Sequence, residues 1–330
     1  MTKSPLARCT VRAMTESDWP AVQAGFMHSF VTHRPPQVWA WRYQWHQPHQ
    51  AGWRGWISQA PDGTVAAFFG ATVHRCWIQG QEQPLLIARD NYSHPLWRHH
   101  SGASRQGLFV STEQAFHAAG AQEALLCMGI GLDRRARLST LLNVCTPYHK
   151  GHWWRQSLPT PSPQEHGYAI QVLPTQFAEP TWNTLWAQYR QGLRISLVRD
   201  REFLAWRFDD RQGQPYWRFA LWSITSAAPV GFVVLTPTEP GRAILVDLVL
   251  PQAPQAVRDA WLQITRWLRD RGISHLDTFI GQACPAHPWL PLLGFTPVAP
   301  PLPVQPVYRC YTPLDFDNDY PFTLADSDLY

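Results

Sequence analysis

The sequence predicts an α+β protein in which one fold occurs twice. Its 330 residues fit two domains of ordinary size. Helical and strand-like segments are mixed along the chain, which is typical of an α+β protein. Segments of the same type also recur in the same order in the two halves. Because each half is long enough to bury its own core, we expect a duplicated domain and not a solenoid of short repeats.

The first half alternates strand-like and helical segments. Residues 8–13 alternate as a strand does, and Thr15 with Ser17 and Asp18 can cap a helix that runs on to Phe30. Asp62-Gly63 is typical of a hairpin turn. The other elements expected here are a short aromatic helix at 35–48, strands at 53–57, 64–73, 76–78, 85–90 and 124–129, and helices at 108–119 and 134–145.

A proline-rich stretch separates the two halves. Pro159, Pro161 and Pro163 interrupt both the helical and the strand period, so we place a linker at 157–167. This division predicts an N-terminal domain at 1–156 and a C-terminal domain at 168–330. The second half then predicts helices at 182–189, 199–208 and 255–271, and strands at 217–224, 230–236, 243–250 and 274–280.

The duplication can be followed in register. Residues 40–43, AWRY, match residues 205–208, AWRF, at an offset of 165. A strand follows this segment in each half, and the two strands are separated by the same offset of 165. Residues 87–90, IARD, parallel residues 244–247, ILVD, after a shift of only a few positions. If the halves share one topology, the tryptophans of the first pair lie on corresponding helices, and the aspartates that end the second pair lie on corresponding strands.

The repeated tryptophan–arginine pairs have a structural interpretation. We expect Trp41 and Trp206 to fill the core, because an indole ring buries a large apolar area. Arg42 and Arg207 are then expected to reach a carboxylate or a helix C-terminus. A place in the wall of an acceptor pocket is the alternative for these residues.

Composition excludes several classes of protein. The net charge of +4 and the pI near 8.8 are too weakly basic to indicate nucleic-acid binding. The N-terminus has no apolar run of signal-peptide length, and no segment has the length of a membrane span. The six cysteines are scattered without a CxxC pair, so we expect reduced thiols and a cytoplasmic protein.

A strand, a basic loop of small residues and a helix follow one another in the first half. The apolar run 85–88 leads into the loop 98–107, and the helix 108–119 comes next. Such an arrangement offers backbone N–H groups and the positive end of a helix dipole to a phosphate. Arg98 and Arg105 could add charge-assisted hydrogen bonds. An exposed loop with two solvated arginines is the alternative.

In element order, nearly the whole chain resembles a tandem GNAT protein, which has two acyl-CoA N-acyltransferase folds. The resemblance rests on the WAWRY and LAWRF helices, the strand entering the basic loop, the LLGF segment at 292–295 and the FTLADSDLY segment at 322–330. It implies, in each domain, a mixed and mostly antiparallel sheet flanked by helices and splayed between its fourth and fifth strands. It also implies acetyl-CoA or another acyl-CoA in that splay.

The family's phosphate-binding motif is R/Q-x-x-G-x-G/A, and residues 98–103 match it in part. A serine stands where the motif has its middle glycine. No basic glycine-rich loop follows Asp247, so the second copy is expected not to bind the cofactor. The cofactor-binding residues that the resemblance implies are Tyr92, Arg98, Ser101, Gly102, Ala103, Arg105 and Gly107.

Three residues are candidates for acid–base chemistry in such a transferase. The reaction needs a base for the amine, polarisation of the thioester carbonyl and an acid for the departing thiolate. Asp90, at the end of its strand, or His94 could act as the base, and Tyr148 could act as the acid. The structural alternatives are a turn cap for Asp90, a hydrogen bond to a backbone carbonyl for His94, and packing for Tyr148.

No pattern in the sequence indicates a metal site. The paired histidines lack the spacing of a metal-binding helix, and Asp315, Asp317 and Asp319 alternate as in a calcium loop without its glycine and glutamate. We interpret those aspartates as part of a solvated tail.

The leading functional hypothesis is an acyl-CoA-dependent N-acyltransferase that acts on a small-molecule amine. In this hypothesis the first copy is the catalytic one. A Fem-like transferase that uses aminoacyl-tRNA is one alternative, although it calls for a larger basic surface than this charge suggests. A non-catalytic tandem protein that binds a ligand or partner is another. The sequence does not indicate the acceptor amine, the acyl chain length or the oligomeric state.

Overall fold

The computed structural model describes residues 9–43, 50–97, 107–158, 169–211, 213–225, 228–327 and 329–330. The chain divides into two compact units that differ from the two halves of the sequence. Unit 1 comprises Met1–Arg75, Gln83–Tyr148 and Val304–Leu314. Unit 2 comprises Cys76–Glu82, His149–Pro303 and Asp315–Tyr330. Among the described residues, no helix is long and apolar enough to cross a membrane.

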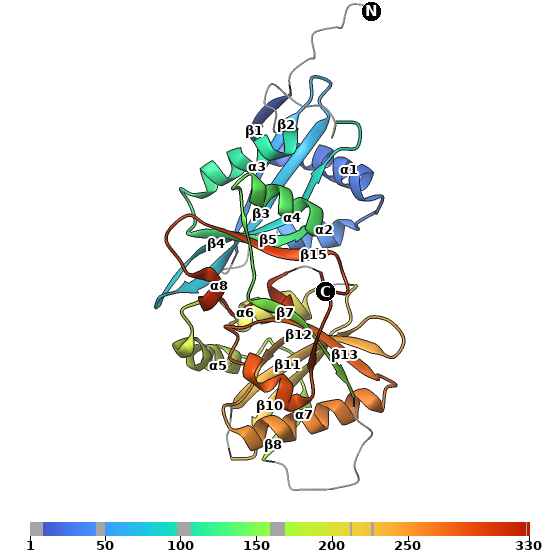
Figure 1. The fold of residues 1–330 in the computed structure, drawn as a ribbon, viewed down its shortest axis with the longest axis vertical. Coiled ribbons are helices and arrows are strands. Elements are labelled where there is room, and N and C mark those ends of the chain that lie inside the picture. Colours follow the sequence, from blue (N-terminus) through green and yellow to red (C-terminus); the bar gives the residue numbers. More distant parts are fainter. Residues whose placement is uncertain are drawn as a thin grey trace, which may run out of the picture. The chain divides into compact units, whose positions relative to one another are not determined.

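The sheet of unit 1 is mixed and mostly antiparallel. Its strand order is β1-β2-β3-β4-β5-β15-β6. β4 and β5 are parallel, whereas β1–β2, β2–β3, β5–β15 and β15–β6 are antiparallel pairs. The strands, coloured along the sequence in Figure 1, are β1 (Thr10–Ala13), β2 (Gln50–Gln59), β3 (Val65–Ile78), β4 (Gln81–Ser93), β5 (Leu126–Leu132), β6 (Thr146–Pro147) and β15 (Val304–Cys310).

The sheet of unit 2 repeats that order. It runs β8-β10-β11-β12-β13-β7-β14, and only β12–β13 is a parallel pair. Its strands are β7 (Gly151–Ser157), β8 (Ile170–Pro174), β10 (Trp217–Ser223), β11 (Pro229–Pro237), β12 (Arg242–Val249), β13 (His275–Gly281) and β14 (Thr296–Val298). A further short strand, β9 (Ile195–Leu197), pairs with the end of β3, Cys76–Ile78, inside unit 2. The predicted α+β class with two mostly antiparallel sheets is confirmed.

The sixth strand in each sheet comes from the other half of the sequence. β7 follows β6 closely along the chain but pairs with β13 and β14 in unit 2. β15 lies near the end of the chain but pairs with β5 and β6 in unit 1. The predicted domains 1–156 and 168–330 do not include this exchange, because the pattern within a strand does not reveal which strand it will pair with.

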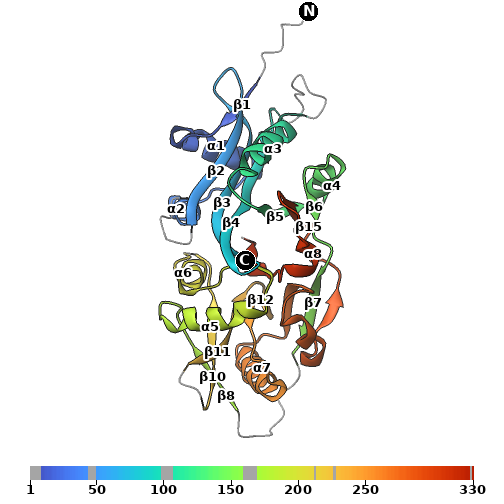
Figure 2. The same ribbon diagram turned by 90° about the vertical axis from the view of Figure 1, so that its left-hand side faces the viewer.

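Helices flank both sheets. In unit 1, α1 and α2 lie on one face of the sheet and α3 on the other (Figure 2). The helices of unit 1 are η1 (Glu16–Asp18), α1 (Trp19–Phe30), α2 (Pro36–Tyr43), α3 (Gly107–Gly120) and α4 (Asp133–Leu141). Those of unit 2 are α5 (Thr181–Tyr189), η2 (Arg190–Gly192), α6 (Arg201–Leu204), the π-helical turn η3 (Ala205–Asp209), α7 (Pro254–Arg269), η4 (His287–Trp289), η5 (Pro291–Leu293), α8 (Phe316–Asp319) and η6 (Leu324–Asp326).

The pleat of the third strand explains why both faces of each sheet are covered. In β3, Phe68 contacts Trp19 of α1, whereas the next residue, Phe69, contacts Phe116 of α3. Successive side chains of a strand point to opposite faces, so a run of apolar residues needs a helix layer on each side. The long apolar stretch 65–73 therefore predicts a strand that is buried on both faces.

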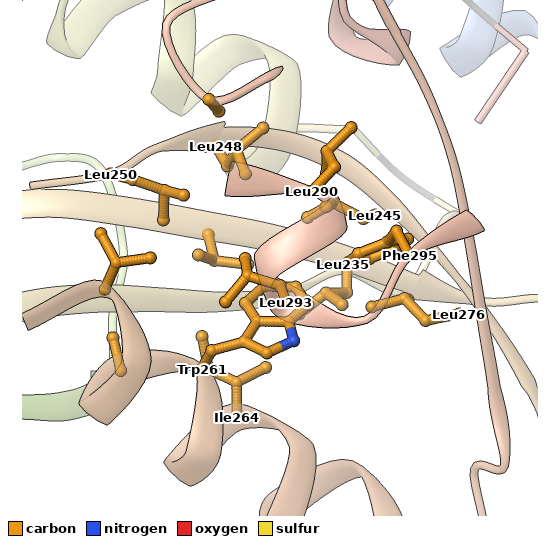
Figure 3. Packing of buried hydrophobic residues seen from close by; sticks show 14 of the residues in the cluster. Leu235, Leu245, Leu248, Leu250, Trp261, Ile264, Leu276, Leu290, Leu293 and Phe295 are labelled. Atoms are coloured by element: carbon orange, nitrogen blue, oxygen red, sulfur yellow. The ribbon is translucent and has the colours of Figure 1, made fainter. Parts of the chain in front are cut away.

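Unit 2 is built in the same way. Phe232 of β11 contacts Trp182 of α5, and the next residue, Val233, belongs to the core cluster beneath α7. In this cluster Trp261 and Ile264 of α7 pack with leucines from the central strands and with the segment that ends at Phe295 (Figure 3). Each unit thus has its own core, as the length of the halves predicts.

The duplication is confirmed element by element. Trp41 lies on α2, just before the second strand of its sheet, and Trp206 lies on η3, just before the second strand of the other. Asp90 and Asp247 lie on the fourth strands, β4 and β12. Both tryptophans are buried, which confirms their expected place in the core.

Some element boundaries differ from the expectation. Residues 76–78 continue β3 instead of forming a separate strand, and the helix expected at 134–145 ends at Leu141, shortly before Asn143 adopts a left-handed conformation with φ 54°. The strand β7 was not predicted. Of the predicted linker at 157–167, residues 157 and 158 are described, and the rest lies outside the described residues.

Candidate functional site

The fourth and fifth strands of unit 1 separate partway along their length. They pair in parallel only from Leu85 and Leu126 to Ala88 and Gly129, although β4 continues to Ser93 and β5 to Leu132. Asp90, just beyond the last pair, has φ 55°, in the left-handed region that few residues other than glycine adopt. This irregularity turns β4 away from β5. The splay that the family resemblance implies is therefore present in unit 1.

Two residues of α2 and Arg34, which precedes α2 in the chain, hold Asp90 in this conformation. Arg42 donates from Nη1 to Oδ1 at 2.6 Å, and the Tyr43 hydroxyl donates to Oδ2 at 2.9 Å. Arg34 forms an ion pair with Oδ2 at 2.7 Å. Burial, followed by the nearby Asp90 charge, holds the pKa of Tyr43 well above its ordinary value, so this hydroxyl keeps its proton and donates. Arg42 thus reaches a carboxylate, as expected.

His94 and Tyr92 follow Asp90 but contact other parts of unit 1. The backbone N–H of His94 donates to Ala66 of β3, and the His94 ring lies 5.4 Å from the ring of His28. The Tyr92 hydroxyl donates to the carbonyl of Val22 in α1 at 3.0 Å. The side chain of Tyr92 thus anchors α1 to the sheet, so any contact of Tyr92 with a cofactor would involve its main chain.

Tyr148 lies at the other end of the sheet order, after β6. It is 1% exposed. Its N–H donates to the Pro306 carbonyl, and its carbonyl accepts from Gln305 Nε2 at 2.7 Å, so it is tied to β15. The described contacts of the three predicted acid–base residues therefore involve different elements: α2 for Asp90, α1 and β3 for His94, and β15 for Tyr148.

Most of the predicted phosphate loop lies outside the described residues. Arg98, Ser101, Gly102, Ala103 and Arg105 all fall there. Gly107, the last predicted residue of the loop, begins α3 with φ 78°. A left-handed glycine at that point lets the chain turn sharply into the helix.

The corresponding place in unit 2 is filled by the chain itself. β12 and β13 pair only from Arg242 to Ile244 on β12, so these strands also separate before they end. The segment Phe322–Ser327, which we call the plug segment, contacts both strands beyond that point. The N–H of Gly281, at the end of β13, donates to the carbonyl of Phe322 at 2.8 Å.

A buried charge cluster holds the plug segment on β12. Arg199 donates from Nε to Asp247 Oδ2 at 2.9 Å and from Nη2 to Asp326 Oδ1 at 2.7 Å. The Thr323 hydroxyl donates to Asp247 Oδ1 at 2.9 Å. Both carboxylates have 0% side-chain exposure, and the guanidinium has 4%. Buried charges at this depth are tolerated only when they are paired and hydrogen-bonded.

The side chain of Arg207 binds backbone carbonyls of the plug segment. It donates to the carbonyls of Ala325 at 3.2 Å and Ser327 at 2.9 Å. These carbonyls lie at the end of η6, so the expected contact of Arg207 with a helix C-terminus is confirmed.

Sequence analysis missed Arg34, Arg199 and Asp326. A signal for the first two was present, because Arg34 and Arg199 share the offset of 165 that relates the two tryptophan–arginine pairs. Asp326 lies in a segment that resembles a polar tail, and no local pattern predicts its burial. The nearby Asp319, expected in a solvated tail, pairs with Arg194 and has only 12% side-chain exposure.

The buried charge cluster that holds the plug segment predicts a pH effect on stability. Burial raises the pKa of Asp326 from 3.8 to about 6, against the opposing effect of Arg199 and with a further increase from Asp247. Between pH 4 and 6, Asp326 is therefore protonated in the folded chain and deprotonated in the unfolded chain. Its contribution to stability falls as pH rises through that window. Asp326→Asn cannot titrate, and we expect melting temperatures of the variant minus the parent to increase from pH 4 to 6. Parallel curves would contradict this prediction.

Among the described residues, no group of three or more histidine, cysteine, aspartate or glutamate side chains could hold a metal ion. All six cysteines are described, and none forms a disulfide.

Comparison with known proteins identifies the fold. No protein-family model matches the sequence, and no curated protein matches it either. A solved structure from Enterococcus faecalis V583, described as a probable N-acyltransferase, matches with a TM-score of 0.68 and 11% identity, over 92% of this chain and 72% of that chain. A tandem GNAT protein from the clavulanic acid biosynthesis pathway matches with a TM-score of 0.58 and 14% identity, over 93% of this chain and 100% of that chain.

The chain has a tandem GNAT fold. Saccharomyces cerevisiae N-myristoyltransferase, solved with bound myristoyl-CoA, also matches, with a TM-score of 0.52 and 8% identity over 93% of this chain and 83% of that chain. The tandem GNAT fold agrees with the repeated strand order and with the splay between the fourth and fifth strands in each unit. At these identities the likeness concerns the fold and not the substrate.

Proposed function

We propose that this protein is an acyl-CoA-dependent N-acyltransferase that transfers an acetyl or other acyl group to a small amine, with unit 1 as the catalytic copy. The observation that carries the proposal is the splay of β4 from β5 after Ala88 in unit 1. In unit 2 the plug segment lies on the corresponding strands. The fold likeness to N-acyltransferases supports acyl transfer as the reaction class.

The cofactor's phosphates would be held at the loop before α3. Backbone N–H groups at a helix N-terminus and the guanidinium groups of Arg98 and Arg105 are suited to a pyrophosphate. The acyl-CoA, when bound, supplies the thioester. Backbone N–H groups of residues 91–92 on the irregular part of β4 would donate to its carbonyl oxygen and stabilise the negative charge that develops there.

The charged partners of Asp90 suggest that it is a positioning residue. Both of its carboxylate oxygens are bound by Arg34, Arg42 and Tyr43, which fix the turn of β4. Because both oxygens of Asp90 are already bound by Arg34, Arg42 and Tyr43, we assign removal of the amine proton to His94 or to a water molecule. Tyr148 is proposed as the acid that protonates the thiolate when the C–S bond breaks and the new C–N bond forms.

Titration with CoA tests the proposal. Arg98→Ala and Arg105→Ala each remove a charge-assisted contact with phosphate, so we expect each to weaken CoA binding by about 1.5–3 kcal/mol, roughly tenfold or more. Calorimetry of the two variants beside the parent measures this directly.

Arg54→Ala is a suitable control for those variants. Arg54 is a half-exposed arginine of β2 that pairs with Glu123, so its removal takes the same charge from unit 1 at a surface position. We expect its CoA affinity to equal that of the parent. Absence of saturable heat with the parent at millimolar CoA would exclude an acyl-CoA enzyme and favour a non-catalytic binding protein.

A further inference from the structure

The side chains of β4 change from one face of the sheet to the other partway along the strand. Leu86 and Ala88 pack in the apolar cluster beneath α3, whereas Tyr92 packs in the cluster beneath α1. Residues separated by an even number of positions point to the same face of a regular strand. β4 therefore contains one extra residue between Ala88 and Tyr92, which is a β-bulge, and Asp90 with its φ of 55° lies in it.

The side chain of Asn91 takes part in the hydrogen bonding between β3 and β4 at this bulge. The backbone N–H of Gly70 on β3 donates to Oδ1 of Asn91 at 2.7 Å. Because the donor is a backbone N–H, the atom that accepts from it is the oxygen of the side-chain amide. Main-chain bonding is present again at His94, whose N–H donates to the carbonyl of Ala66. Asn91 thus ties the bulge to β3.

The bond at His94 also gives the direction of the main chain in the bulge. Successive N–H groups of an extended strand point alternately to its two neighbouring strands. Since the His94 N–H points to β3, the N–H of Tyr92 does so too, and that of Asn91 points to the side of β5. There β5 no longer pairs with β4, because the last pair is Ala88 with Gly129. Of the N–H groups at 91 and 92, the one of Asn91 therefore lies on the splayed side.

Both partners of the Gly70–Asn91 bond are replaced in unit 2. At the offset of 165, Gly70 corresponds to Leu235, and the residue after the fourth-strand aspartate is Leu248 instead of Asn91. The two leucines pack in the core cluster of unit 2 (Figure 3). The register of β12 also shifts just before Asp247, so an irregular fourth strand forms there with apolar side chains. The fold itself therefore does not require the asparagine, which occurs in the copy proposed to be catalytic.

The residues on both sides of Asn91 are fixed. A Cβ atom at Gly70 would lie 2.2 Å from Cζ of Phe68, so glycine leaves the space that this ring occupies. The Phe68 ring contacts the ring of Tyr92, 5.9 Å between centroids, and the Tyr92 hydroxyl is anchored to α1. Asp90 is held by its ion pairs. A donor in such a rigid surrounding needs no reorganisation when charge develops on its acceptor.

We propose that Asn91 is a positioning residue of the transferase. By accepting the Gly70 N–H, its side chain holds its own backbone N–H toward the splay, where that N–H donates to the carbonyl of the acyl-CoA thioester. This proposal rests on the proposed function and adds the side chain that orients its backbone donor. Orientation matters because a hydrogen bond weakens steeply as the donor turns away from the acceptor.

The infrared band of the acetyl carbonyl, measured with acetyl-CoA labelled with ¹³C at that carbon, tests the proposal. A hydrogen bond to the oxygen weakens the C=O bond, so the bound band of the parent should lie below that of free acetyl-CoA. Asn91→Leu introduces the residue type of unit 2 and removes the acceptor for Gly70. We expect it to lose about half or more of the displacement of the band. Asn91→Asp keeps an acceptor and should retain most of the displacement.

Asn183→Leu is the matched control. Asn183 lies on α5 of unit 2 and accepts the backbone N–H of Arg201 at 3.0 Å, so this substitution breaks the same kind of bond away from the splay. We expect its band to equal that of the parent. Melting temperatures verify that the variants are folded. If Asn91→Leu is unstable, Asn91→Ala removes the same acceptor without adding volume.

Hydrogen exchange of the Gly70 amide, assigned in protein labelled with ¹⁵N-glycine, measures the bond itself. Exchange should be faster in Asn91→Leu than in the parent, by roughly tenfold or more, and close to the parent in Asn91→Asp. Equal exchange in Asn91→Leu and the parent would show that the side chain does not hold β3, and it would overturn the inference.

Calorimetric titration with CoA separates this inference from the proposed function. CoA lacks the acyl carbonyl, so we expect equal CoA affinity in all variants. A changed band with unchanged CoA affinity supports the inference. A band in Asn91→Leu at the position of the parent overturns it and leaves CoA binding standing, and so does a parent whose bound band equals that of free acetyl-CoA. A parent that does not bind CoA removes the proposed function, and the inference with it.

Discussion

Replacing Arg199 with methionine is expected to lower the free energy of unfolding by about 3–5 kcal/mol, the typical cost of removing one partner from a buried ion pair. Arg199 is the shared partner of Asp247 and Asp326, and both carboxylates have 0% side-chain exposure. Methionine fills much of the same volume, so the loss comes mainly from two charges left without their cation. Urea unfolding of the variant beside the parent measures the effect.

Two further variants give this prediction its controls. Arg242→Met removes an arginine of β12 whose side chain is 39% exposed and 3.7 Å from Asp277, so we expect a loss of less than about 1 kcal/mol. Adding Asp247→Asn and Asp326→Asn to Arg199→Met removes the unpaired charges and should restore part of the lost stability. A single variant as stable as the parent would contradict the burial of this cluster.

Truncation of Trp206 to alanine is the second change with a large expected effect, a loss of about 3–5 kcal/mol. The Trp206 side chain is 1% exposed and packs beside Phe203, 5.8 Å between ring centroids, on the irregular helical segment before β10. Removing the ring leaves a cavity that the surrounding core can close only in part. Thermal unfolding of Trp206→Ala and the parent gives the shift in melting temperature.

Leu262→Ala is the matched control for that substitution. Leu262 lies on α7 of the same unit with 56% of its side chain exposed, so its truncation removes few contacts. We expect a change within about 0.5 kcal/mol. An unchanged melting temperature for Trp206→Ala would place the ring outside the core and remove the structural interpretation of the repeated motif.

Local periodicity was enough to predict most elements and the duplication. The apolar run from Val65 predicts a strand because β3 is buried on both faces, and the spacing of apolar residues in 255–271 predicts α7 because only one face of that helix meets the core. The repeated AWRY and AWRF segments predict corresponding helices for a similar reason. Each copy has to fill the same space beside its second strand with an indole ring.

The pairing of distant segments could not be predicted in this way. β15 pairs with a strand more than 170 residues earlier in the chain, and nothing in its own pattern names that partner. The plug segment has the composition of a polar tail, yet Asp326 is buried because Arg199 and Thr323 lie within reach in the folded chain. At the candidate site, Asp90 could be located from its strand, but its three partners required the structure.

The exchange of β7 and β15 has a consequence for protein synthesis. A ribosome that has released the first 150 residues has made every other strand of the unit 1 sheet, but not the one that lies between β5 and β6. Until residues 304–310 emerge, the edge of β5 is without its neighbour, and an open strand edge can pair with other chains. The sheet of unit 1 therefore stays incomplete until most of the second half of the chain has been made. Neither half, expressed from a gene cut between them, encodes a complete unit.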